Sequence, residues 1–93
     1  MYGTVRVYAG SSDLADRLVE HESEVKSVVG GIDGFRGYYV IRTAEGTVTV
    51  SLYDTEEGAA ASTAAAAAWM RENQPDFVAT PPQVSAGEVV ISA

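Results

Sequence analysis

The chain has 93 residues, of which 46% are hydrophobic and 20% are charged, so we expect one globular domain, residues 1–93, with a single core. Thirteen acidic residues against six basic ones give a net charge of −7, which argues against nucleic-acid and anionic-membrane partners. Without cysteine there is no disulfide or thiolate metal site, and no apolar run is long enough to span a bilayer. We therefore expect a cytoplasmic protein.

Residues 2–9 are predicted to form a strand, because two kinds of residue alternate along them. A period of two gives the strand two different faces. One face would carry Tyr2, Thr4, Arg6 and Tyr8, and the other Gly3, Val5, Val7 and Ala9.

A single helix is predicted next, beginning at the N-cap residues Ser11 to Asp13 and ending at Gly30 and Gly31. Its apolar residues recur at helical spacing and would face the core. They are Leu14, Leu18, Val25, Val28, Val29 and Ile32.

His21, the only histidine, occupies a place in this apolar stripe where leucine would be expected. One interpretation is a structural histidine, hydrogen-bonded or partly exposed at the edge of the helix. The other is a catalytic residue in a pocket, because imidazole exchanges a proton near neutral pH. A single histidine cannot hold a metal, so no metal site is predicted.

A β-hairpin is predicted over 35–43 and 47–53, since two runs rich in β-branched and aromatic residues flank a short loop containing Gly46. A second helix should begin near Asp54 and end near Asn73, before Pro75. Eight of the ten residues from 59 to 68 are alanine, which favours either close packing on the sheet or a void for a ligand beneath the helix. Residues 88–92 are predicted to form the last strand.

The element order predicts an α+β, ferredoxin-like βαββαβ fold, with a four-stranded antiparallel sheet and two helices on one face. Three segments are more specific: GFRGYY at 34–39, VTVSLYD at 48–54 and AWMREN at 68–73. They resemble the dimeric α/β-barrel superfamily, particularly its small antibiotic-biosynthesis-monooxygenase-like proteins. The resemblance implies a homodimer with sheets face to face, and a pocket between the helices and the sheet of each protomer.

The same resemblance bears on cofactors. The haem-degrading branch of the superfamily needs an asparagine near the first strand and a histidine ligand on the second helix. This chain has neither residue in those places, although it shares a tryptophan, Trp69. We therefore predict no cofactor.

Trp69, Tyr39 and Arg42 are the residues predicted to contact a ligand. Trp69 either packs in the core or forms a pocket wall. Tyr39 is one of several strand tyrosines that suit either a pocket or a dimer interface. Arg42, like Arg6 and Arg36, either forms salt bridges or recognises an acidic or enolate group.

Two functions from different classes follow. The first is a small homodimeric protein resembling cofactor-independent monooxygenases, which would act on a small apolar, aromatic or polyketide-like compound. His21 or a tyrosine would then be the base, and an arginine would bind the anion. The second is a non-catalytic ligand-sensing or oligomerisation module, which the scarcity of ionisable groups in the expected pocket favours.

Overall fold

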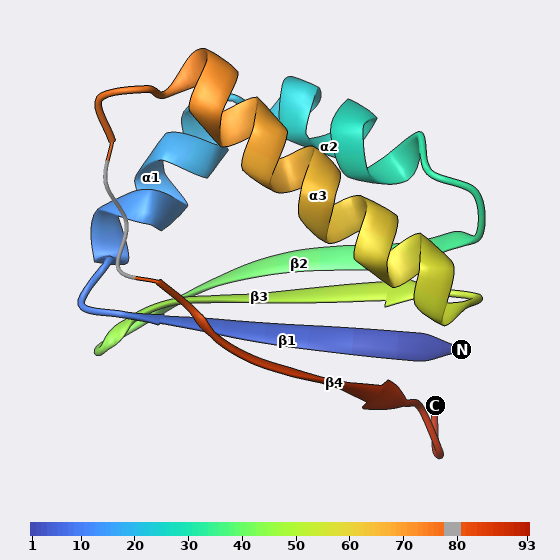
Figure 1. The fold of residues 1–93 in the computed structure, drawn as a ribbon. Helices are drawn as coiled ribbons and strands as arrows, with labels where there is room; N and C mark the ends of the chain where they lie inside the picture. The colour runs from blue at the N-terminus through green and yellow to red at the C-terminus, as the bar shows by residue number, and fades with distance from the viewer. Residues whose placement is uncertain (78–80) are drawn as a thin grey trace.

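The computed structural model describes residues 1–77 and 81–93. Its helices all lie on one face of a single sheet, so the molecule has two layers (Figure 1). In chain order the elements are β1 (Tyr2–Ala9), α1 (Ser12–Glu20), α2 (Glu22–Gly30), β2 (Phe35–Thr43), β3 (Gly46–Tyr53), α3 (Glu56–Asn73) and β4 (Gln83–Glu88). Within those residues, no helix is both long and apolar enough to cross a membrane.

The sheet is antiparallel throughout, with strand order β2-β3-β1-β4. Val5 of β1 lies opposite Val50 of β3, which in turn lies opposite Tyr39 of β2. The predicted α+β, ferredoxin-like arrangement is confirmed, including the hairpin formed by β2 and β3.

The sheet face beneath the helices is unusually polar. Residues that alternate onto it include Thr4, Thr47, Thr49 and Ser51, all buried, and the charged residue Arg6, which is 6% exposed. Their hydroxyl groups are hydrogen-bonded in several places, for example Thr47 Oγ1, which donates to the Ser11 carbonyl at 2.7 Å. The helices therefore pack against hydroxyl groups of the sheet as well as against hydrocarbon.

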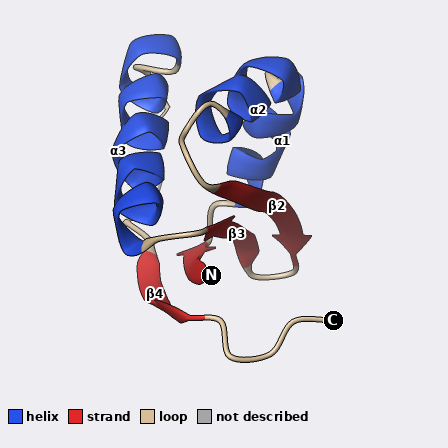
Figure 2. Cartoon of the chain, turned by 90° about the vertical axis from the view of Figure 1, so that its right-hand side faces the viewer, coloured by secondary structure: helices blue, strands red, loops and turns tan. Residues whose placement is uncertain are grey.

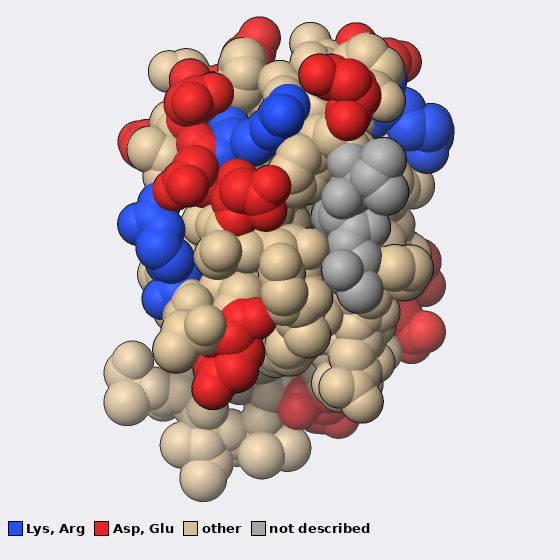
Figure 3. All heavy atoms as spheres, turned by 90° about the vertical axis from the view of Figure 1, so that its left-hand side faces the viewer, with Lys and Arg blue, Asp and Glu red and all other residues tan. Residues whose placement is uncertain are grey.

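The opposite face of the sheet is apolar and open. Figure 2 shows all the helices on one side of the strands, with the segment after β4 passing on the other. The paired strand residues on this outer face are uncharged, and the large ones are Val5, Val7, Tyr39, Ile41, Val48, Val50 and Leu52. In Figure 3 most charged side chains lie over the upper, helical part of this side of the molecule, with further Asp and Glu side chains lower down.

The predicted first helix is in fact two helices, α1 and α2, that meet at His21. Its backbone (φ −117°, ψ 32°) leaves the helical region. Its amide donates to Leu18, and its carbonyl accepts from Val25, so one helix ends and the next begins there. The prediction of one continuous helix was therefore wrong at this residue.

The last strand was also predicted at the wrong place. Residues 88–92 have strong β propensity, yet β4 is formed by Gln83–Glu88, which pair with β1 from Val7 to Tyr2. Beyond the strand, the Val89 amide donates to the Met1 carbonyl, while Val90 and Ile91 are each 86% exposed.

The second predicted helix corresponds to α3. Thr55 caps it, with Oγ1 accepting a hydrogen bond from the Gly58 amide, and Glu56 and Glu57 in the first turn complement the helix dipole. Near its other end Trp69 joins the core cluster of Leu14, Leu18 and Val25.

Candidate functional site

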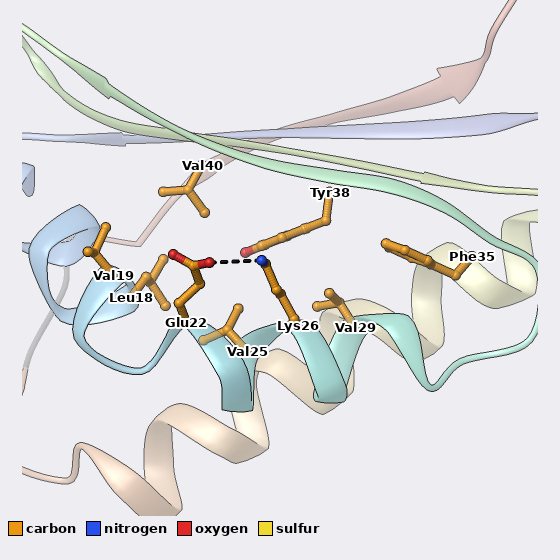
Figure 4. Close-up of a pocket in the computed structure, with 9 residues that line it drawn as sticks. All are labelled: Leu18, Val19, Glu22, Val25, Lys26, Val29, Phe35, Tyr38 and Val40. Atoms are coloured by element: carbon orange, nitrogen blue, oxygen red, sulfur yellow. Dashed lines mark ion pairs between the residues drawn. The ribbon is translucent and has the colours of Figure 1, made fainter.

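The main cavity lies between the α1–α2 pair and strand β2, and Figure 4 shows its walls. Its volume is about 450 Å³, which falls within the range of roughly 300–1,000 Å³ typical of small-molecule sites. Most of the lining is hydrocarbon, and the cavity is partly open to solvent. The lining residues are Leu18, Val19, Glu22, Val25, Lys26, Val29, Phe35, Tyr38 and Val40.

Tyr38 supplies a hydroxyl group to the cavity wall, from the second strand. Burial raises the pKa of Tyr38 to about 12, with nearby Tyr8 adding to the rise and Arg6 opposing it. Burial also raises the pKa of Tyr8. Both hydroxyl groups therefore stay protonated at neutral pH, where they are hydrogen-bond donors rather than bases.

An ion pair stands at the mouth of the cavity. Lys26 Nζ lies 2.8 Å from Glu22 Oε2, and both side chains are largely exposed (Figure 4). The hydrogen bond from Lys26 lowers the pKa of Glu22, so this carboxylate is ionised and paired at neutral pH. The entrance is thus charged, whereas the interior is apolar.

His21 lies at the junction of the helices, and it does not line the cavity. Its Nδ1 is 2.9 Å from Glu24 Oε2, and its Nε2 is 3.0 Å from Gln74 Nε2. The oxygen of the Gln74 amide accepts a hydrogen bond from Arg17, so the amide nitrogen faces His21 as a donor. Both ring nitrogens of His21 are therefore engaged, Nε2 by the Gln74 amide and Nδ1 by the Glu24 carboxylate.

The ring of His21 also meets Trp69 of α3 edge-on, at a centroid distance of 5.4 Å. Replacing His21 by leucine is therefore expected to lower the free energy of unfolding by about 1–2 kcal/mol, because the Gln74 and Glu24 groups lose their partner. Thermal melts of His21→Leu, Gln74→Leu and the double variant measure this loss of stability. The double variant should lose less stability than the sum of the two single variants. An unchanged or raised melting temperature for His21→Leu would contradict this structural role.

The other three predicted ligand contacts are dispersed. Tyr39 lies on the outer face of the sheet and is 58% exposed, because the alternation along β2 turns it away from Tyr38. Arg42 forms an exposed ion pair with Asp16. Trp69 is buried in the core and lines a shallow hollow between α2 and α3 instead of the main cavity.

The main cavity does not lie beneath the Ala-rich helix, because its lining contains no residue of α3. Of the eight alanines in 59–68, Ala59 is buried, as is Ser62 beside them, whereas Ala60, Ala61, Ala64 and Ala67 are exposed. The residues that sequence reasoning missed were detectable: Leu18, Glu22, Val25 and Val29 recur at helical spacing, and Tyr38 and Val40 alternate with Tyr39.

The residues present do not fit haem. Helix α3 contains no histidine, and both ring nitrogens of His21 are already hydrogen-bonded. Over the described ranges 1–77 and 81–93, no group of three or more acidic, histidine or cysteine residues is arranged to hold a metal ion.

No family model matches the sequence, and no curated protein matches it either. Solved structures do match. The haem degrader MhuD of Mycobacterium tuberculosis, solved with two haems in its active site, has a TM-score of 0.73 at 18% identity, covering 100% of this chain and 99% of that one. A putative antibiotic biosynthesis monooxygenase from Nitrosomonas europaea has a TM-score of 0.70 at 19% identity, covering 96% and 89%. This chain has their fold.

Two further structures extend the comparison. A dimeric ferredoxin-like protein from an uncultured marine organism has a TM-score of 0.68 at 13% identity, covering 99% of this chain and 95% of that one. A Streptomyces coelicolor monooxygenase in complex with nanaomycin D has a TM-score of 0.62 at 18% identity, covering 98% and 91%. The ferredoxin-like fold is therefore shown, while the chemistry must be argued from this chain's own residues.

Proposed function

We propose that this chain is a small homodimeric pocket protein that binds a small apolar or aromatic compound between α1–α2 and β2. The observation that carries the proposal is the cavity of about 450 Å³, with its hydrocarbon walls and a protonated Tyr38 hydroxyl. Hydrocarbon walls favour an apolar body, and one donor can orient an oxygen atom. The monooxygenase with bound nanaomycin D supports this choice of ligand class by analogy.

The dimer is proposed from the outer face of the sheet. Seven large uncharged residues form this face, and Val5, Val7, Tyr39 and Ile41 each expose more than a third of their surface. For a chain of net charge −7, an uncharged face is also where a second copy meets least repulsion. The similarity to a dimeric ferredoxin-like protein supports the same arrangement.

The finer proposal is a cofactor-independent oxygenase, in which an acidic substrate is deprotonated and its carbanion reacts with oxygen in the cavity. A non-catalytic ligand-sensing module is the second candidate, and a specific observation favours it. The cavity wall contains no histidine, and its single carboxylate, Glu22, is paired with Lys26. Substrate-dependent oxygen uptake by the purified protein, lost in a cavity-filling variant, would distinguish the oxygenase from the sensor.

A cavity-filling substitution tests the binding site. Val40→Trp should weaken the binding of 2-naphthamide, a neutral aromatic probe, by at least about tenfold, because the indole occupies the space between β2 and α2. Isothermal titration calorimetry measures the dissociation constant. The matched control is Val84→Trp, at an exposed strand position that does not line the cavity.

Equal binding by Val40→Trp and Val84→Trp would place the probe elsewhere and contradict the proposed site. Circular dichroism melts of both variants establish that the added indole has not unfolded the chain. Failure of the unaltered protein to bind the probe at millimolar concentration would also count against an aromatic-binding pocket.

A further inference from the structure

Arg6 is the only buried arginine in the part of the chain that the structure describes, at 6% exposed. It extends from β1 across the sheet face that the helices cover. Its Nη1 donates to Ser51 Oγ of β3 at 3.1 Å, and its Nη2 donates to Thr63 Oγ1 of α3. The guanidinium is thus held between the two layers, in the interior of the fold.

Within the described residues, both hydrogen-bond partners of Arg6 are neutral hydroxyl groups. The ion pairs of the described residues are Glu22–Lys26, Glu24–His21, Arg36–Asp54 and Arg42–Asp16, all with at least one largely exposed side chain. Burying a cation without a carboxylate is costly, since hydroxyl groups replace only part of the lost hydration. In a chain with thirteen acidic residues, the absence of an ion pair at its buried arginine needs an explanation.

The position of Arg6 near the cavity explains why it has no carboxylate partner. Ser51, which accepts from Arg6, lies directly opposite Tyr38 in the register of β3 and β2. Tyr38 lines the cavity. Arg6 itself does not line the cavity, but its partner Ser51 lies one strand spacing, roughly 5 Å, from the cavity residue Tyr38. The charge of Arg6 also acts on the hydroxyl groups of both Tyr8 and Tyr38, so the three groups share one polar region.

We propose that Arg6 is an anion-binding residue of the cavity, and that the ligand is an aromatic or apolar compound bearing a carboxylate or enolate oxygen. This inference rests on the proposed pocket and specifies its ligand class. The apolar body would lie against Val25, Val29 and Val40, while its anionic oxygen accepts from Arg6 and from the protonated Tyr38. The long arginine side chain exchanges its neutral hydroxyl acceptors for the anion, which is the stronger acceptor.

Two probes of nearly the same shape test this assignment. Sodium 2-naphthoate is ionised at pH 7, whereas 2-naphthamide is neutral. Calorimetric titration of the unaltered protein at low salt should give a dissociation constant for 2-naphthoate about tenfold or more below that for 2-naphthamide, because a charged hydrogen bond replaces a neutral one.

In Arg6→Met this preference should disappear, with 2-naphthamide binding changed by less than about threefold. Arg6→Lys keeps the charge and should retain part of the preference even if Arg6→Met folds poorly. Arg42→Met removes an exposed, paired arginine from β2, two strands away from β1, and should leave the preference unchanged.

Each outcome has a distinct meaning. Equal binding of the two probes by the unaltered protein, or a preference that survives in Arg6→Met, would overturn the role of Arg6 while leaving the pocket in place. Absence of binding for both probes would overturn the pocket itself, and the inference with it.

Discussion

Val50→Glu is expected to convert the proposed dimer into a monomer of 9.8 kDa. Val50 lies in the middle of the outer sheet face, between Val5 of β1 and Tyr39 of β2. The substitution would place one carboxylate from each protomer into an uncharged interface, where neither has a partner. We expect association to weaken by more than about 3 kcal/mol, or roughly 100-fold. Light scattering across a micromolar dilution series measures the mass.

The matched control is Ala67→Glu, which adds the same charge at an exposed position of α3. It should keep the mass of the unaltered protein, twice 9.8 kDa. A monomeric mass for the unaltered protein at micromolar concentration would contradict the dimer, and a dimeric Val50→Glu would mean that a different surface mediates association.

Gly46→Ala is expected to be among the most destabilising single-atom additions in the chain. Gly46 has a φ of +153°, and a Cβ there would lie 2.1 Å from the Tyr8 carbonyl oxygen. Because that oxygen belongs to the backbone of β1, the sheet itself would have to shift. We expect a loss of at least about 3 kcal/mol in the free energy of unfolding, measured by urea denaturation.

Two other glycines separate the cost of backbone strain from the cost of the steric clash. Gly10 has a φ of +79° but open space around it, so Gly10→Ala should cost only the backbone strain, about 1–2 kcal/mol. Gly87→Ala meets no atom within 4 Å and should be close to neutral. If Gly46→Ala were no worse than Gly10→Ala, the close approach to β1 would not be the cause.

The fold was largely predictable because most of its elements have strong local signals. The alternation in β1, the short loop between β2 and β3, and the cap at Thr55 each place an element boundary within a residue or two. The errors have tertiary causes. The helix breaks at His21, whose ring contacts Glu24 and also Gln74, 53 residues away, a partner that the local sequence does not indicate. The last strand is selected by pairing with β1, which overrides the higher β propensity of residues 88–92.

The site was less predictable, for two physical reasons. Alternation divides the residues of a strand between two faces without saying which face the helices cover, so Tyr39 was chosen where Tyr38 lines the cavity. A buried polar face is also the opposite of the usual expectation for a sheet with one covered side. Arg6 was noticed as a strand arginine, but only its 6% exposure and neutral partners mark it as unusual.

The distribution of polarity over the sheet has a consequence for how the chain acquires its stability. Hydrocarbon that an ordinary two-layer domain would place under its helices lies here on the outer face, as Val5, Val48, Val50 and Leu52. Under the proposed dimer, much of the hydrophobic free energy is released only when two chains meet. Folding and assembly then become one equilibrium, so the stability of the native state rises with protomer concentration. The same exposed hydrocarbon lowers the solubility of the free chain, so selection for solubility competes with selection for the native state.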